Sequence, residues 1–206
     1  MAEKTTLKKL RENERDVRKN LIIDAATAMF AQKPFKNVSM RDIAAEAGLS
    51  PASIYHYFSD RDELFVEAFL REARRVQQGM ERLIGEQGTV NLEQVSAEYL
   101  LRLMDDDSFF PMMIHFMLDG DISPQFVEKF NTNAVGYVLD LLEDVFRRNG
   151  VQDNVRLLAH AFFACLNGIL ITFRNNPGRT HQESEKHILR LASLVSAVFR
   201  RGAGPA

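Results

Sequence analysis

The sequence predicts an all-α protein with a small N-terminal domain and a larger C-terminal one. Apolar residues recur at helical spacing along most of the 206 residues, and no segment alternates in the manner of a strand. Segments containing Gly and Pro separate these helical patterns. Hydrophobic residues make up 46% of the chain and charged residues 26%, which is the balance of a soluble globular protein.

The first three expected helices follow one another closely. The stretch VRKNLIIDAATAMFAQ has a helical apolar face, and Pro34 ends it. Ser39 is placed to cap the next helix, with Asp42 at the spacing of a capping box. Gly48 suits the left-handed residue that ends that helix. Ser50 then caps a third, short helix.

Longer helices are expected in the rest of the chain. A fourth begins at Ser59 or Asp60 and continues through Arg75 towards Gly85. The later ones are expected at Leu92–Met104, Ser108–Leu118, Pro124–Arg148, Gln152–Phe173 and His181–Arg200. This organisation predicts one domain over residues 15–75 and a second over residues 76–206.

The second and third helices are joined by only three residues, GLS. So tight a turn forces one helix across the other, which is the geometry of a helix-turn-helix over about residues 39–58. The expected buried side is Ile43, Ala47, Leu49, Ile54 and Phe58. The outward face is short and polar, with Tyr55 at its margin, and it suits insertion into a DNA major groove. A plain helical hairpin with a well-capped turn is the alternative.

The stretch FKNVSMRDIAAEAGLSPASIYHYFSDRDELF resembles the DNA-binding region of the TetR (tetracycline repressor) family of regulators. The resemblance covers about a quarter of the chain, with residue type and spacing agreeing nearly throughout. Pro34 stands where the family usually has Gly, Tyr57 replaces the usual His and Arg61 the usual Lys. Ala52 or Ser53 replaces the common Gly of the reading helix.

The resemblance implies a set of DNA-contacting residues. They are Ser39, Arg41, Ser50, Pro51, Ala52, Ser53, Tyr55, His56, Tyr57 and Arg61. Ser39 and Arg61 would contact phosphate, and Arg41 would reach phosphate or a guanine edge. Residues 50–53 would meet base edges, and residues 55–57 phosphates. Core packing is the alternative for Tyr55, and plain solvent exposure for residues 56 and 57.

Basic residues also precede this unit: Lys4, Lys8, Lys9, Arg11, Arg15, Arg18 and Lys19. They are compatible with a tail that adds non-specific DNA affinity, with simple disorder, or with an extended, solvated first helix.

The last two expected helices are candidates for a dimer interface. The first has small residues at Ala161, Ala164 and Gly168, which allow close helix packing. The second has an apolar stripe of Ile188, Leu191, Val195 and Val198. Members of the family bind DNA as homodimers, so the resemblance implies a four-helix interface between two copies. Ordinary core packing within one chain is the alternative.

The family typically has a ligand cavity in its C-terminal domain. The stretch SFFPMMIHFMLDG is apolar almost all round, which predicts a buried helix with a deformable Met- and Phe-rich lining. The expected ligand-binding residues are Phe109, Phe110, Met112, Met113, His115, Phe116, Met117, Asn133, Tyr137 and Asn167. They favour a small apolar or aromatic effector, and core packing without a cavity is the alternative.

Other function classes find little support in the residues. The chain lacks an apolar run of membrane-spanning length, an export signal and a second cysteine beside Cys165, so we expect a cytoplasmic protein without a membrane partner. The run DDDS is read as a solvated capping loop, and the His spacing suggests no metal site. No nucleophile–base pair or nucleotide loop appears, so we expect neither an enzyme nor a cofactor.

The sequence thus predicts a ligand-responsive transcriptional regulator. In this hypothesis a homodimer represses from a palindromic operator in double-stranded DNA and is released when the effector binds. An architectural DNA-binding dimer without a ligand, a transcriptional activator, and a helical enzyme targeted to DNA remain as alternatives.

Overall fold

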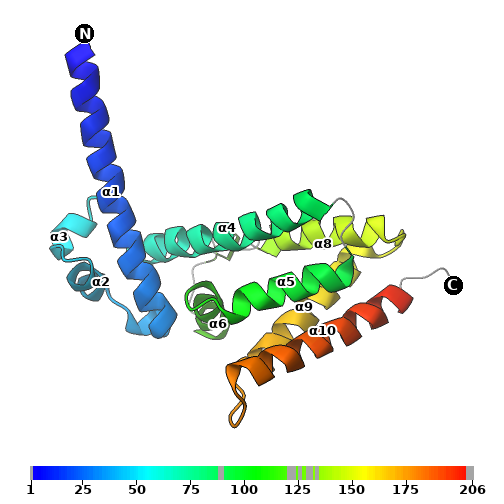
Figure 1. The fold of residues 1–206 in the computed structure, drawn as a ribbon. Coiled ribbons are helices and arrows are strands. Elements are labelled where there is room, and N and C mark those ends of the chain that lie inside the picture. Colours follow the sequence, from blue (N-terminus) through cyan, green and yellow to red (C-terminus); the bar gives the residue numbers. More distant parts are fainter. Residues whose placement is uncertain are drawn as a thin grey trace. The chain divides into compact units, whose positions relative to one another are not determined.

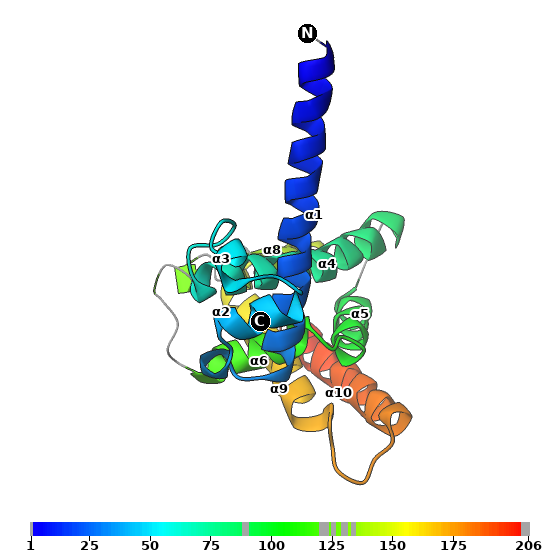
Figure 2. The ribbon, with the colours of Figure 1, turned by 90° about the vertical axis from the view of Figure 1, so that its left-hand side faces the viewer.

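The computed structural model describes residues 2–87, 91–119, 124, 127–128, 132 and 135–202, and in these residues it is helical and contains no strand (Figures 1 and 2). The elements are α1 (Ala2–Gln32), η1 (Phe35–Asn37), α2 (Met40–Glu46), α3 (Pro51–Ile54), α4 (Arg61–Gln87), α5 (Leu92–Met104), α6 (Phe109–Asp119), α8 (Gly136–Arg148), α9 (Val155–Phe173) and α10 (His181–Gly202). The all-α fold class is confirmed.

The chain forms two compact units, whose division differs in part from the expected domains. One unit is Met1–Glu72 with Asp107–Lys129, and the other is Ala73–Asp106 with Phe130–Ala206. The first division falls within α4, close to the expected boundary after residue 75. The helix α6, however, was expected in the C-terminal domain and lies in the N-terminal unit, where it packs against α1 and η1.

An aromatic cluster forms the core of the N-terminal unit. The ring of Phe65 contacts those of Phe30, Phe35 and Phe69, with centroids 4.8, 5.0 and 6.0 Å away. Phe69 in turn packs on Phe109 of α6 at 5.0 Å. These side chains come from α1, η1, α4 and α6, so burying them fixes these helices against one another.

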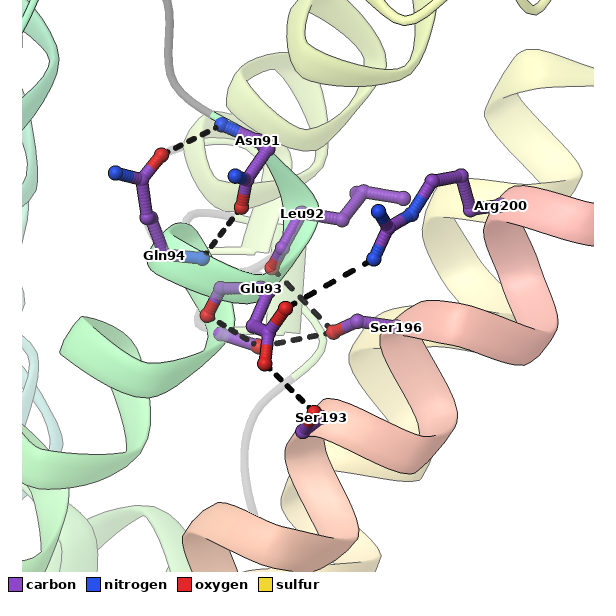
Figure 3. A network of polar contacts seen from close by, with 8 residues as sticks. Asn91, Leu92, Glu93, Gln94, Ser193, Ser196 and Arg200 are labelled. Atoms are coloured by element: carbon purple, nitrogen blue, oxygen red, sulfur yellow. Dashed lines mark hydrogen bonds and ion pairs between the residues drawn. The ribbon is translucent and has the colours of Figure 1, made fainter.

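The second unit packs α5, α8, α9 and α10 together with the end of α4. Figure 1 shows α5 and α10 side by side, with α9 next to them. Hydroxyls of Ser96 and Ser196 meet at 3.0 Å in the buried α5–α10 contact. On its rim, Glu93 accepts a hydrogen bond from Ser193 at 2.6 Å and lies 3.9 Å from Arg200 (Figure 3). These contacts join α10 to the start of α5 through Ser193, Ser196 and Arg200.

The helix boundaries confirm the expected elements and correct several ends. The first helix begins at Ala2, which supports the extended-helix alternative for the basic segment. The fourth reaches Gln87. The helix expected from Pro124 is described from Gly136. The next begins at Val155 because Asn154 adopts a left-handed φ of 52° that ends the preceding turn.

Candidate nucleic-acid interface and effector cavity

The start of α2 is built by a reciprocal cap. The Ser39 hydroxyl accepts a hydrogen bond from the Asp42 backbone N–H at 3.2 Å. The Asp42 carboxylate accepts from the backbone N–H and the hydroxyl of Ser39, at 3.1 and 2.6 Å. These bonds with Ser39 lower the pKa of Asp42. The predicted capping box is confirmed, and because both Ser39 donors are used within it, the structure gives Ser39 a helix-building role before any contact with phosphate.

The turn between α2 and α3 depends on Gly48, whose φ of +67° favours glycine. The Leu49 N–H donates to the Ala44 carbonyl at 2.9 Å, which closes the turn over a small, fully buried residue. The two helices therefore cross closely, as the spacing predicted.

The helix α3 begins at a second cap and is only four residues long. Ser50 accepts a hydrogen bond from the Ser53 backbone N–H at 3.2 Å, and Pro51 takes the first helical position, where it has no N–H to lose. Ile54 and Phe58 are buried and anchor the segment to the core.

The outward face of this segment consists of residues predicted to contact DNA. Pro51, Ala52, Tyr55 and His56 are exposed, as is Arg41 on α2. Ser53 and Tyr57 are half-buried. Tyr55 is 56% exposed, which rules out the core-packing alternative in this structure. An exposed face of small groups, a phenol and an imidazole offers both base-edge and phosphate contacts.

Arg61 makes contacts within the chain that the sequence did not predict. One guanidinium nitrogen, Nη1, donates to the carbonyls of Phe35 and Val38, both at 3.2 Å, and lies 3.5 Å from that of Lys36. The guanidinium also stacks over the Phe35 ring at 4.0 Å. Arg61 therefore holds the segment leading into Ser39, whereas the resemblance implied a clamp on phosphate. A local pattern cannot reveal this, because the three acceptors lie 23–26 residues away in the sequence.

A small, partly open cavity of about 10 Å³ lies in the second unit. Its lining is apolar apart from one phenol: Met80, Val95, Tyr99, Val138, Leu141, Leu142, Phe163 and Leu166. The Tyr99 hydroxyl donates to Asn167 Oδ1 at 3.1 Å, and the Asn167 amide donates to the Phe163 carbonyl at 2.9 Å. Burial raises the pKa of Tyr99, so the phenol stays neutral.

None of the predicted ligand-binding residues whose side chains the structure describes lines this cavity. Four of them are buried in the N-terminal unit: Phe109, Phe110, Met112 and Met113. His115 belongs to the same unit, where its Nδ1 lies 3.0 Å from the carbonyl oxygen of Phe30. Asn133 and the side chains of Phe116 and Met117 lie outside the described residues.

Two predicted residues do lie in the cavity's unit. Asn167 supports Tyr99, and Tyr137 precedes the lining residue Val138 in α8. Burial and the negative charge of Glu81, to which the Tyr137 hydroxyl is hydrogen-bonded, raise the pKa of Tyr137. The sequence reasoning missed Tyr99, for which the only signal was an aromatic residue on the apolar face of an amphipathic helix.

The outer sides of α9 and α10 expose apolar residues. Leu157 and Leu194 are 70% and 60% exposed, and Ile171 and Val198 are close to these values. The predicted small residues Ala161, Ala164 and Gly168 are exposed on α9 as well. The stripe predicted on α10 divides, because Ile188 points into the unit's own core and Val198 points outward. By length and composition α9 could also cross a membrane, but its buried side packs against three other helices.

No group of three or more His, Cys, Asp or Glu side chains gathers at metal-binding distance in the described ranges. In the DDDS run, Asp105 Oδ1 lies 3.2 Å from His181 Nε2, and the Asp106 carbonyl accepts from Arg174 at 2.6 Å. These contacts close a loop between helices of the second unit.

Comparisons with known proteins agree with this geometry. Residues 22–68 match the family described as bacterial regulatory proteins, tetR family. An uncharacterised HTH-type transcriptional regulator of Haemophilus influenzae is 41% identical over 59 residues, which are 28% of this chain and 29% of the relative. The match thus spans less than a third of that relative's length.

Solved structures match over nearly the whole chain. A putative TetR-family transcriptional regulator from Mesorhizobium loti is 25% identical, with a TM-score of 0.68 over 89% of this chain and 96% of that one. A putative regulator from Saccharomonospora viridis in complex with choline (22% identity, TM-score 0.61, 85% and 95% covered) shares the fold. The Bacillus subtilis regulator FadR in complex with stearoyl-CoA also shares the fold; it is 19% identical, with a TM-score of 0.68 over 89% of this chain and 98% of that one. The N-terminal segment of the chain thus matches the TetR family of bacterial regulatory proteins, and the fold is that of solved TetR-family regulators.

Proposed function

We propose that the protein is a cytoplasmic transcriptional repressor that binds a palindromic operator as a homodimer. The observation that carries the proposal is the outward face of α3 and of the turn that follows it. Pro51, Ala52, Tyr55 and His56 are exposed there, while Ile54 and Phe58 are buried in the core. A two-fold dimer would present two such faces to successive major grooves.

The dimer is supported by the apolar outer sides of α9 and α10. Leu157, Ile171, Leu194 and Val198 are each more than half exposed, which is costly for a soluble chain unless another surface covers them. In a two-fold dimer the second copy presents the same apolar surface, so each copy covers the exposed residues of the other.

A small apolar effector is proposed to control DNA binding through α4. This helix begins at Arg61 in the unit that contains the helix-turn-helix and reaches Met80, which lines the cavity of the other unit. A ligand that enlarges the cavity would displace Met80 and so shift the conformational equilibrium of α4. The effect requires that the ligand prefer the conformation that misfits DNA. Relatives of this fold bound to choline and to stearoyl-CoA support a small-molecule effector, although these two ligands differ in polarity.

The test is selection of bound sequences from a random DNA pool with the full-length protein. We expect an enriched palindrome, and failure to enrich any sequence would overturn the proposal. Replacing Tyr55 and His56 together by Ala should abolish enrichment while the far-ultraviolet circular dichroism spectrum stays unchanged, because both side chains are exposed. A reporter gene with the recovered site beside its promoter should be silenced by the protein, whereas increased expression would indicate an activator.

A further inference from the structure

The N-terminal half of α1 has a basic bias, and the side chains described within it are mostly exposed to solvent. The first 20 residues contain seven Lys and Arg against four Asp and Glu. Between Lys9 and Leu21 every side chain that the structure describes is exposed, apart from half-buried Lys19. Figures 1 and 2 both show this half of α1 projecting beyond α2 and α3.

Most of the basic positions share one face of the helix. Each residue of an α-helix advances the direction of the side chain by about 100°. Positions 4, 8, 11, 15 and 18 therefore fall within a sector of about 80°, and all five are Lys or Arg. The acidic residues Glu12, Glu14 and Asp16 point to either side of this sector. We call positions 4, 8, 11, 15 and 18 the basic stripe.

The basic stripe continues the side of α1 that packs against the DNA-binding elements. By the same register, the buried residues Ile22, Ala26 and Met29 lie in line with it. At the junction, Lys19 Nζ lies 3.4 Å from Glu67 of α4 and 5.5 Å from the centre of the Phe58 ring, just after α3. The stripe thus faces the same side as the helix-turn-helix and extends beyond it.

We propose that the basic stripe binds the phosphate backbone of the DNA next to the half-site occupied by the same unit. This inference rests on the proposed DNA-binding function. The projecting segment is about 20 Å long, and its basic positions recur once per turn of roughly 5.4 Å, so several can face a phosphate backbone together. The only ion pair described within the stripe, Arg18 with Glu14 at 2.8 Å, is exposed and therefore weak enough to be exchanged for phosphate.

Another face of the same segment could instead bind protein. Leu10, Val17 and Leu21 are each at least half exposed and lie about 100–140° around the helix from the stripe. Glu14 interrupts this row, and no comparable acidic residue interrupts the stripe. The charge pattern therefore favours DNA, and helix pairing with a further copy of the chain becomes an outcome of the test.

The test measures operator affinity as a function of salt for the full chain and the triple variant Lys8→Gln, Arg11→Gln and Arg15→Gln. Gln keeps the helix propensity of Lys and Arg. Removing one phosphate-binding charge should reduce the slope of log K against log salt by about 0.9. With three positions in each subunit, we expect a slope smaller by about 3–5, which corresponds to an affinity lower by about 10³–10⁵-fold near 0.1 M salt when the two affinities converge near 1 M.

Two controls make the result specific. Lys9→Gln lies about 160° around the helix from Arg11 and should leave the slope unchanged. Arg82→Gln with Arg179→Gln and Arg201→Gln removes three exposed charges from the other unit and should also have little effect. Equal slopes for the wild type and the stripe variant would overturn the inference.

The experiment separates the two proposals. If the wild type selects no DNA sequence, the proposed function fails. If the wild type binds an operator and the stripe variant keeps the same slope, only the stripe inference fails. A change in sedimentation from dimer to a smaller or larger species in the stripe variant, without a change in slope, would show that the segment binds another copy and would likewise overturn the DNA inference.

Discussion

The guanidinium of Arg61 lies 4.0 Å above the ring of Phe35, at the point where η1 leads into the first cap of the helix-turn-helix. The same group donates hydrogen bonds to the carbonyls of Phe35 and Val38. The first residue of α4 thus supports the segment that positions α2. Phe35 is itself buried among the rings of Phe30 and Phe65, which makes this support rigid.

We predict that Arg61→Gln destabilises the N-terminal unit by about 1–2 kcal/mol, because Gln cannot make the charge-assisted bonds to two carbonyls or stack as a cation on the ring. Operator affinity should fall together with the melting temperature, and the salt dependence should keep its slope. Arg61→Lys should restore little, because an ammonium cannot reproduce the planar fork or its stacking. A stable variant with a slope reduced by about 0.9 would show instead that Arg61 binds phosphate.

A second prediction concerns the dimer. A Cβ added at Gly168 meets no atom within 4 Å in one chain, so a larger side chain there fits the isolated subunit. We predict that Gly168→Glu yields monomers by sedimentation, because a charge would be buried where α9 meets its copy. Gln182→Glu, at an exposed position near the start of α10, adds the same charge and should remain dimeric. Unchanged dimers of Gly168→Glu would place the interface elsewhere.

A third prediction concerns the cavity. Val138→Phe should fill it, and we expect binding of the apolar probe 1-anilinonaphthalene-8-sulfonate to weaken at least about tenfold while operator affinity is retained. The change Met113→Trp, at a position that the sequence analysis expected to bind the effector, should instead destabilise the N-terminal unit. Met113 is 2% exposed there, and overpacking a core costs about 1–3 kcal/mol or more. Equal probe binding by wild type and Val138→Phe would exclude this cavity as the binding site.

The features that the sequence predicted well are local. Ser39 with Asp42, and Ser50 with Ser53, are three residues apart, so their bonds follow from helix geometry alone. Gly48 is similar, because its left-handed backbone is a property of one residue.

The features that were missed depend on partners distant in the sequence. The helix α6 is apolar on nearly every side, so its sequence shows that it is buried without showing which unit buries it. From its local sequence, Arg61 is expected to be an exposed cation at a helix start. Its carbonyl partners in the preceding segment can be identified only from the folded structure. The cavity has the same origin, since Tyr99 finds its partner 68 residues later.

The last prediction uses the buried pair Tyr99–Asn167. Burial raises the pKa of Tyr99 above its ordinary value of 10.0, even though the hydrogen bond to Asn167 acts in the opposite direction. The folded state therefore keeps the Tyr99 proton at a pH where the unfolded chain has begun to lose it. The resulting contribution to the free energy of unfolding is complete below the pKa of the unfolded chain, and it is lost as the pH rises above about 10. Wild-type stability to urea should therefore decline between about pH 9 and 11.

Tyr99→Phe should remove this part of the decline. At pH 7 the variant should be less stable by about 1–3 kcal/mol, because Asn167 Oδ1 loses its buried donor. The two stability curves should then converge as the pH rises. Tyr137→Phe is the matched control, since the pKa of Tyr137 is also raised but its ring is only half-buried, so its effect should be smaller. Parallel curves for the wild type and Tyr99→Phe across this range would show that the Tyr99 phenol ionises as readily in the folded chain as in the unfolded one.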